Sequence, residues 1–216
     1  MTRIPRLHLI SNREICPLAR FPGVARSAVA GGVDAIHLRE PGLERGRLKE
    51  LIQRVQKSIA SSSAKLLINR EIEVVWSAMT DGVHLAENQF AEICDARDRL
   101  PEGSLLGISI HSVEAALAAS EAGVDYLIAG HVFETGSKPG QVGRGLEFIE
   151  RISQAVTIPV IAIGGITPEN TPDVRSAGAY GVAVMSGILS VTDPESAARR
   201  YSDAIYATRN GSKDEH

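Results

Sequence analysis

Short apolar segments recur along the chain, with longer amphipathic segments between them. Several of the short segments are apolar throughout, such as 160–163 and 182–185, which is typical of parallel strands covered on both faces. The pattern predicts eight strands, at 7–11, 35–39, 65–69, 82–85, 105–111, 126–131, 159–165 and 181–187.

The segments between these strands have helical periodicity. In the segment after the fifth strand, Ser112 is a candidate N-cap and Gly123 a candidate C-terminal stop. In the segment after the second strand, one helix face is formed by Leu48, Leu51, Ile52, Val55 and Ile59. The remaining helices are predicted near 24–30, 71–79, 90–99, 146–155, 170–176 and 194–208.

A regular alternation of strands and helices favours an α/β fold, a closed (β/α)8 TIM barrel. An open parallel sheet of the same strands would leave two unpaired edges, which a barrel removes. No Pro/Ser-rich linker divides the chain, so we expect a single barrel domain over 1–209 and a flexible C-terminal tail over 210–216.

Composition excludes several functional classes. Aromatic residues make up 4% of the chain and the net charge is −3, which argues against nucleic acid and membrane surfaces as partners. No apolar run approaches the length of a membrane span, and Cys16 and Cys94 lack metal-ligand spacing. We therefore expect a cytoplasmic protein with two reduced thiols.

Polar residues stand where each predicted strand ends. In a barrel these positions converge at one end, where chemistry collects. They are Ser11, Arg39 with Glu40, Asn69, His84, Ser109 with His111, His131, Gly164 with Gly165, and Ser186 with Gly187.

The seventh and eighth strand ends predict a phosphate site. Gly165 and Ser186–Gly187 would let backbone N–H groups approach an oxyanion without interference from a Cβ atom. The alternative is that these glycines serve turns and close packing alone.

His131 ends the sixth strand and is a candidate proton carrier, because an unperturbed histidine titrates near neutral pH. The segment 136–145 after it holds three glycines before Gly145 together with Lys138 and Arg144, a composition typical of a flap over an anion. A structural histidine followed by a surface loop is the alternative.

Arg39 could hold a carboxylate or phosphate through its planar fork, or form an ion pair with Glu40. His37 and His84 lie within apolar runs, which favours a place in the core over metal ligation. No HxH or HExxH spacing occurs, so no metal site is expected.

These residues resemble the thiamine phosphate synthase superfamily, over about residues 7 to 205. The matching motifs are Ala35-Ile36-His37-Leu38-Arg39-Glu40, Leu66-Leu67-Ile68-Asn69, Asp81-Gly82-Val83-His84-Leu85, Leu106-Gly107-Ile108-Ser109, Val160-Ile161-Ala162-Ile163-Gly164-Gly165-Ile166 and Ala183-Val184-Met185-Ser186-Gly187-Ile188. The resemblance implies a (β/α)8 barrel that binds a thiazole phosphate, in a homodimer.

Within the superfamily the chain is most similar to the thiazole tautomerase (TenI) branch. Synthases carry an aspartate after the third-strand asparagine and another after the Gly-Val-His-Leu motif, and these two hold magnesium. Here Arg70 follows Asn69, and 86–90 contains no aspartate, although Glu87 or Glu71 could substitute. Gly130-His131-Val132-Phe133-Glu134-Thr135 matches the tautomerase motif, whose histidine is the general acid/base.

The resemblance therefore predicts an isomerase, a thiazole tautomerase that aromatises a carboxythiazole phosphate with His131 as the proton carrier and no cofactor. The residues predicted to bind the substrate are Arg39, Thr135, Lys138, Gly165, Met185, Ser186 and Gly187. Two alternatives remain open: a magnesium-dependent thiamine phosphate synthase, and a non-catalytic binding or regulatory homologue.

Overall fold

The computed structural model of the chain describes residues 3–207, so the predicted tail 210–216 lies outside the described residues. Eight parallel strands close into one barrel in sequence order, which confirms the predicted (β/α)8 fold. The strands are β1 (Leu7–Ile10), β2 (Ala35–Leu38), β3 (Lys65–Asn69), β4 (Gly82–Leu85), β5 (Leu105–Ile110), β6 (Tyr126–Gly130), β7 (Val160–Ile163) and β8 (Gly181–Val184).

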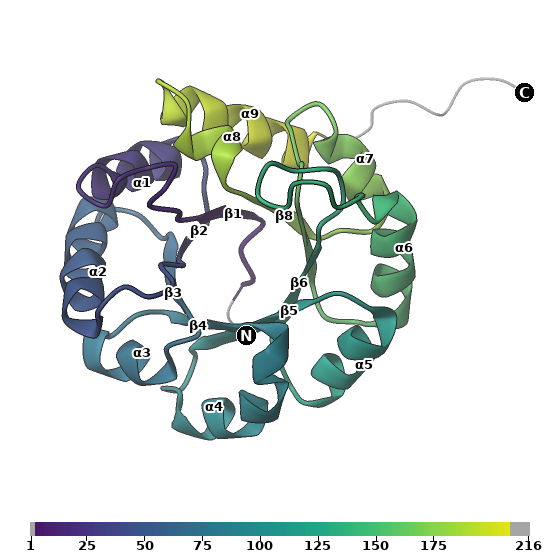
Figure 1. The fold of residues 1–216 in the computed structure, drawn as a ribbon, viewed down its shortest axis with the longest axis horizontal. Coiled ribbons are helices and arrows are strands. Elements are labelled where there is room, and N and C mark those ends of the chain that lie inside the picture. Colours follow the sequence, from purple (N-terminus) through teal and green to yellow (C-terminus); the bar gives the residue numbers. More distant parts are fainter. Residues whose placement is uncertain (1–2, 208–216) are drawn as a thin grey trace, which may run out of the picture.

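Helices form a ring around the barrel (Figure 1). The eighth predicted strand is too long, because the chain leaves the barrel after Val184 and begins a short helix at Ser186. The helices are α1 (Phe21–Ala30), α2 (Arg45–Ile59), α3 (Ile72–Ala78), the 3-10 helix η1 (Glu87–Glu92), α4 (Ile93–Arg99), α5 (Val113–Glu121), α6 (Gly145–Ala155), α7 (Thr171–Ser176), α8 (Ser186–Leu189) and α9 (Pro194–Tyr206).

The helix signals in the sequence act as expected. The Ser112 side chain accepts a hydrogen bond from the backbone N–H of Ala115 at the start of α5, and Gly123 adopts a φ of +85° just after that helix. On α2 the five apolar positions of the predicted face are all buried against the barrel: Leu48, Leu51, Ile52, Val55 and Ile59.

Three aspartates fix the amino ends of the strands. Asp34, Asp81 and Asp125 each stand directly before an even-numbered strand. Each accepts a backbone N–H from the start of the preceding odd-numbered strand: Leu7 at 3.0 Å, Leu66 at 2.9 Å and Leu106 at 2.7 Å. These bonds satisfy donors at the end of the barrel opposite the carboxyl ends of the strands.

The barrel interior holds an unusual polar cluster, which we call the histidine cluster: His8, His37, His84 and Tyr126. His37 and His84 are buried, as the sequence predicts, and His8 Nδ1 lies 2.8 Å from His37 Nε2. Tyr126 crosses the interior over Gly107, where a Cβ atom would lie 2.1 Å from the tyrosine ring. Glycine is therefore required at that position.

Both cysteines are free thiols, as predicted, with Cys16 buried and Cys94 exposed. Among residues 3–207 no helix has the length and apolar character needed to cross a membrane.

Candidate active site

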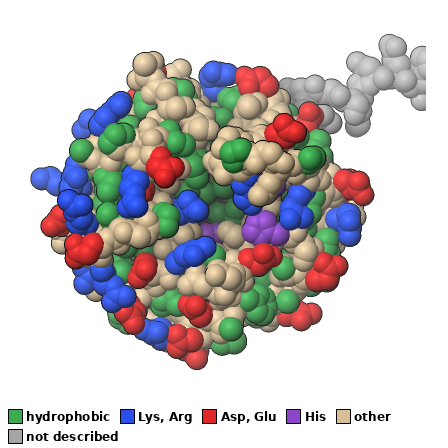
Figure 2. Space-filling view, in the orientation of Figure 1, with side chains coloured by type: hydrophobic (Ala, Val, Ile, Leu, Met, Phe, Trp, Pro, Cys, Tyr) green, Lys and Arg blue, Asp and Glu red, His purple; other side chains and the backbone are tan. Residues whose placement is uncertain are grey.

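The carboxyl ends of all eight parallel strands meet at one end of the barrel, which we call the mouth. Figure 2 shows a hollow at the centre of this face, with Lys, Arg and His side chains gathered around it. The mouth is therefore the concave part of this face, and basic side chains stand at its rim.

Just after β1 and β2, the side chain of Glu40 is hydrogen-bonded to Ser11. The buried Ser11 hydroxyl donates to Glu40 Oε1 at 2.6 Å and accepts the backbone N–H of Arg39 at 2.9 Å. The Arg39 side chain is exposed, and the structure gives it no ion-pair partner among the described residues. Of the two possibilities for Arg39, the pair with Glu40 is thus absent, and the guanidinium is available to a ligand.

At the end of β6, His131 is 7% exposed. Its Nε2 lies 3.1 Å from the carbonyl oxygen of Val142, so this nitrogen carries the hydrogen and donates it. In the neutral ring Nδ1 is then the acceptor, and it is buried without a partner among residues 3–207. The segment after β6 folds back over the histidine, because the N–H of Arg144 bonds to the His131 carbonyl at 3.0 Å.

Thr135 and Lys138 lie together in that segment, where the Lys138 N–H bonds to the Thr135 carbonyl at 3.0 Å. Both line a cavity of about 400 Å³ formed within residues 134–141. His131 is not among the residues that line it. Ser137 Oγ lies 3.9 Å from the sulfur of Met185, which connects this segment to the end of β8.

The glycines at the ends of β7 and β8 are required by packing within the protein. A Cβ atom on Gly165 would lie 2.5 Å from the carbonyl oxygen of Glu134, and one on Gly187 would lie 2.2 Å from the hydroxyl of Tyr201. Close packing therefore explains these glycines without a ligand. The phosphate contact of Gly165, Ser186 and Gly187 stays a prediction.

Tyr201 on α9 is a residue that the sequence analysis missed. Its hydroxyl contacts the Gly187 position and donates to the carbonyl of Ile166 at 3.0 Å, so it links the segments after β7 and β8. Burial raises the pKa of Tyr201 to about 12, which keeps the hydroxyl protonated as a donor. In the sequence it is indistinguishable from an apolar position on an amphipathic helix.

The acidic residues that follow β3 and β4 do not suit magnesium. Both carboxylate oxygens of Glu87 are occupied by His111, at 3.0 Å from its N–H and 2.8 Å from Nδ1. Glu71 forms an ion pair with Arg45 at 3.5 Å. No aspartate in the described part of the chain falls within four residues after a strand, and Arg70 adds a positive charge there. Proteins hold Mg²⁺ through one or two carboxylates together with substrate phosphates, and these two carboxylates are already engaged, so the residues after β3 and β4 do not fit the ion.

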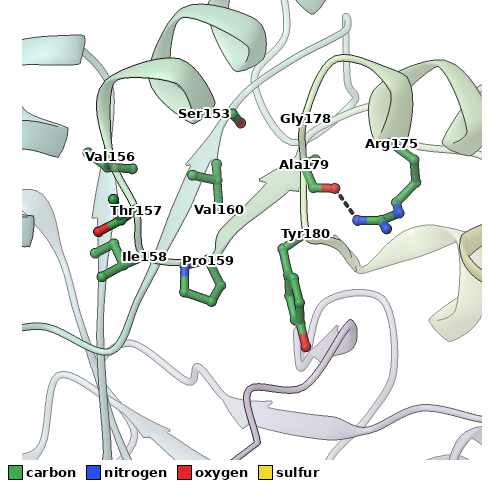
Figure 3. A pocket seen from close by; sticks show the side chains of 10 residues that line it. All are labelled: Ser153, Val156, Thr157, Ile158, Pro159, Val160, Arg175, Gly178, Ala179 and Tyr180. Atoms are coloured by element: carbon green, nitrogen blue, oxygen red, sulfur yellow. Dashed lines mark hydrogen bonds between the residues drawn. The ribbon is translucent and has the colours of Figure 1, made fainter.

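Among residues 3–207 no group of three His, Cys, Asp or Glu side chains is arranged to hold a metal. A separate cavity of about 450 Å³ lies at the other end of the barrel, before β7 and β8 (Figure 3). Its charged side chain, Arg175, donates to the carbonyl of Ala179, so the cation is already engaged within the protein. This cavity is remote from all of the predicted site residues.

Comparison with known proteins identifies the family. A family model described as thiamine monophosphate synthase matches residues 7–188. A thiamine-phosphate synthase of Methanoculleus marisnigri is 37% identical over 204 residues, covering 94% of this chain and 96% of that protein. One of Geobacillus kaustophilus is 36% identical and covers 86% of each chain.

Solved structures agree with these relatives. A thiamine phosphate pyrophosphorylase from Pyrococcus furiosus matches with a TM-score of 0.81 and 30% identity, covering 93% of this chain and 95% of that one. A 3-hexulose-6-phosphate synthase from Salmonella typhimurium matches with a TM-score of 0.75 at 19% identity, covering 93% of this chain and 98% of that one, and shows the fold alone.

These relatives overturn the prediction of an isomerase of the tautomerase branch. Relatives 32% to 37% identical are named thiamine-phosphate synthase, which is a transferase. The prediction rested on the two missing aspartates and on the match of 130–135 to the tautomerase motif. Neither excludes a synthase, since a guanidinium fork also binds phosphate oxygens. With matches over most of its length, the chain belongs to the thiamine monophosphate synthase (TMP-TENI) family.

Proposed function

We propose that this protein is a transferase of the thiamine-phosphate synthase type, which joins a pyrimidine pyrophosphate to a thiazole phosphate and releases pyrophosphate. The observation that carries the proposal is the 37% identity, over 94% of the chain, with a thiamine-phosphate synthase. The exposed guanidinium of Arg39 and the glycine-containing segments after β7 and β8 support it.

The thiazole phosphate would bind at the segments after β7 and β8. There the backbone N–H groups of Gly165, Ser186 and Gly187 would donate to the phosphate oxygens, as in many barrels. Lys138 would add a positive charge from the segment after β6, and Thr135 a hydroxyl donor.

The pyrimidine pyrophosphate would bind against β2 and β3, with the Arg39 fork on its phosphate oxygens. The ring nitrogen of the thiazole attacks the methylene carbon of the pyrimidine, forming a C–N bond as the C–O bond to pyrophosphate breaks. The electron pair leaves on the pyrophosphate oxygen, and the thiazole nitrogen carries no proton that a base must remove.

His131 has a different part in this reaction from the general acid/base first predicted for it. Its buried Nδ1 has no partner among residues 3–207 and is the acceptor of the neutral ring, since Nε2 already donates to Val142. We propose that Nδ1 accepts from an N–H donor of a bound substrate and so orients it. The variant His131→Ala would then weaken substrate binding more than it slows the bound complex, which raises KM more than it lowers kcat.

The test is direct synthesis. Purified protein is incubated with the pyrimidine pyrophosphate and the thiazole phosphate, and thiamine phosphate is measured after oxidation to its fluorescent thiochrome derivative. We expect product from the wild type and a loss of about 10- to 100-fold in kcat/KM for Arg39→Ala, the effect of removing charge-assisted hydrogen bonds.

The matched control is Arg47→Ala, which removes an exposed arginine from the outer face of α2 and should leave turnover unchanged. Absence of thiamine phosphate both with and without added Mg²⁺, with enzyme and substrates at equal concentration, would refute the proposal. Binding of thiazole phosphate without any turnover would indicate a non-catalytic homologue instead.

A further inference from the structure

Arg70 occupies a strained and well-anchored backbone position directly after β3. Its φ of +70° lies in the left-handed region that favours glycine. The N–H of Arg70 bonds to the carbonyl of His84 at 2.9 Å, and its carbonyl accepts from the side chain of Gln89 at 3.3 Å. The backbone is thus held between β4 and η1, and an arginine is kept where glycine would be more stable.

The side chain of Arg70 is exposed, and the structure gives it no ion pair among residues 3–207. The nearby acidic side chains are already engaged by other groups. Glu71 pairs with Arg45, Glu73 pairs with Arg45 and Arg99, and Glu87 bonds to His111. The charge of Arg70 is therefore not compensated by its neighbours in sequence.

A second uncompensated guanidinium belongs to the adjacent strand. β2 and β3 pair with Leu38 opposite Ile68, so Arg39 and Arg70 follow neighbouring strand ends. Both therefore stand at the mouth, where Figure 2 shows basic side chains around the hollow. Glu40, which follows Arg39, is held by Ser11 through Oε1, so one carboxylate stands beside two guanidinium groups. The excess of positive charge attracts an anion of high charge and repels a divalent cation.

We infer that Arg70, together with Arg39, takes up the charge of the substrate's pyrophosphate in place of an aspartate-bound divalent cation, so that this mouth binds pyrophosphate without metal. The inference rests on the proposed function. When the C–O bond of the pyrimidine pyrophosphate breaks, the negative charge that develops on the leaving oxygens is stabilised by hydrogen bonds from the guanidinium groups.

The experiment is calorimetric titration with inorganic pyrophosphate, once in EDTA and once with excess Mg²⁺, and a separate titration with MgCl₂ alone. We expect pyrophosphate to bind in EDTA, MgCl₂ alone to give no binding heat, and added Mg²⁺ to weaken the binding because it sequesters the ligand.

The decisive variant is Arg70→Gly, because the left-handed backbone favours glycine. The variant should unfold at a temperature no lower than that of the wild type, and up to about 3 °C higher. Its pyrophosphate affinity in EDTA should nevertheless fall at least about 10-fold. The control Arg47→Ala removes the same charge from the outer face of α2 and should leave the affinity unchanged.

Binding that requires Mg²⁺, or an Arg70→Gly variant with unchanged affinity, would overturn the inference. The thiochrome assay separates this result from the proposed function. Metal-free binding through Arg70 without synthesis would leave the inference standing and refute the function. Synthesis that depends on Mg²⁺ would do the opposite.

Discussion

Acid should destabilise this protein in an unusually steep way, because of the histidine cluster inside the barrel. Burial lowers the pKa of His8 to about 4 and that of His84 to about 3, and burial together with the neighbouring histidines lowers the pKa of His37 well below its ordinary value. All three rings are therefore neutral in the folded protein at physiological pH.

The direction of the pH dependence of stability follows from proton binding. In the unfolded chain each histidine titrates near pH 6.5, so below that pH the unfolded state binds protons that the folded state excludes. The stability that depends on neutral histidines is complete above pH 6.5 and is lost as the pH falls toward the folded pKa values. For each of the three rings, the unfolding free energy falls by about 1.4 kcal/mol per pH unit below pH 6.5. At pH 5 the loss is about 2 kcal/mol per histidine and about 6 kcal/mol for all three.

That loss is comparable with the whole stability of a typical domain, about 5 to 15 kcal/mol. The assay is urea unfolding followed by circular dichroism at pH 8, 6.5, 5.5 and 5. Carboxylates contribute little in this range, because their ordinary pKa values lie near 4. From the slope of the unfolding free energy against pH, we expect an uptake of about three protons on unfolding near pH 5.

The variant His84→Gln tests whether the proton uptake comes from the histidine cluster. It keeps a polar group near Ser109 and Tyr126, which contact the His84 ring at 2.9 Å and 3.2 Å, and it should reduce the uptake by about one proton. An uptake of less than one proton in the wild type would refute the reasoning, since the folded barrel would then accept charge on these rings as readily as water does.

Three further substitutions test the mouth. Ser11→Ala should cost about 1 to 3 kcal/mol of unfolding free energy in urea titrations, because the part-buried carboxylate of Glu40 loses its donor. Gly187→Ala should lower the unfolding free energy by a similar amount, because its Cβ atom would meet the hydroxyl of Tyr201. Tyr201→Phe should cost about 1 kcal/mol and weaken thiazole phosphate binding in calorimetry, since the bond to Ile166 is lost.

Each of these has a result that contradicts it. Wild-type stability for Ser11→Ala would mean that water replaces the serine at Glu40. The clash argument predicts that the double variant Gly187→Ala, Tyr201→Phe is less destabilised than the sum of its parts, so simple additivity would count against it. Unchanged ligand affinity in Tyr201→Phe would show that the segments after β7 and β8 keep their positions without this bond.

Helices and strands were predictable from the sequence where the spacing of the apolar residues matches the face of the element that is buried. The five apolar residues of α2 repeat with helical spacing because one face of the helix covers the barrel, and β3 and β4 have the predicted bounds. The eighth strand was predicted too long. Gly181–Val184 pairs with β1 and β7, but Ser186 begins α8, and short apolar runs do not distinguish a strand end from a first helical turn.

The partners of the side chains in the site were harder to predict from the sequence. In the sequence Arg39 stands beside Glu40, and their pairing is left open. Only the structure shows that Glu40 bonds to Ser11, which follows another strand. The glycines of the mouth suggested close approach of a phosphate, whereas the groups that approach them in the structure are Glu134 and Tyr201. The activity was predicted wrongly for a related reason. The absence of the two aspartates shows which magnesium ligands are missing, but it does not show which other groups could bind the pyrophosphate.

The sequence by itself determined the order of elements, the single barrel and the end of the barrel where polar side chains collect. All three depend on local periodicity and on the direction of the strands, which neighbouring residues in the sequence determine. The tertiary structure alone decided which charges are compensated. Arg39 and Arg70 are available to an anion because Ser11, Arg45 and His111 engage the neighbouring carboxylates, and these partners are brought together by barrel closure and not by proximity in the chain.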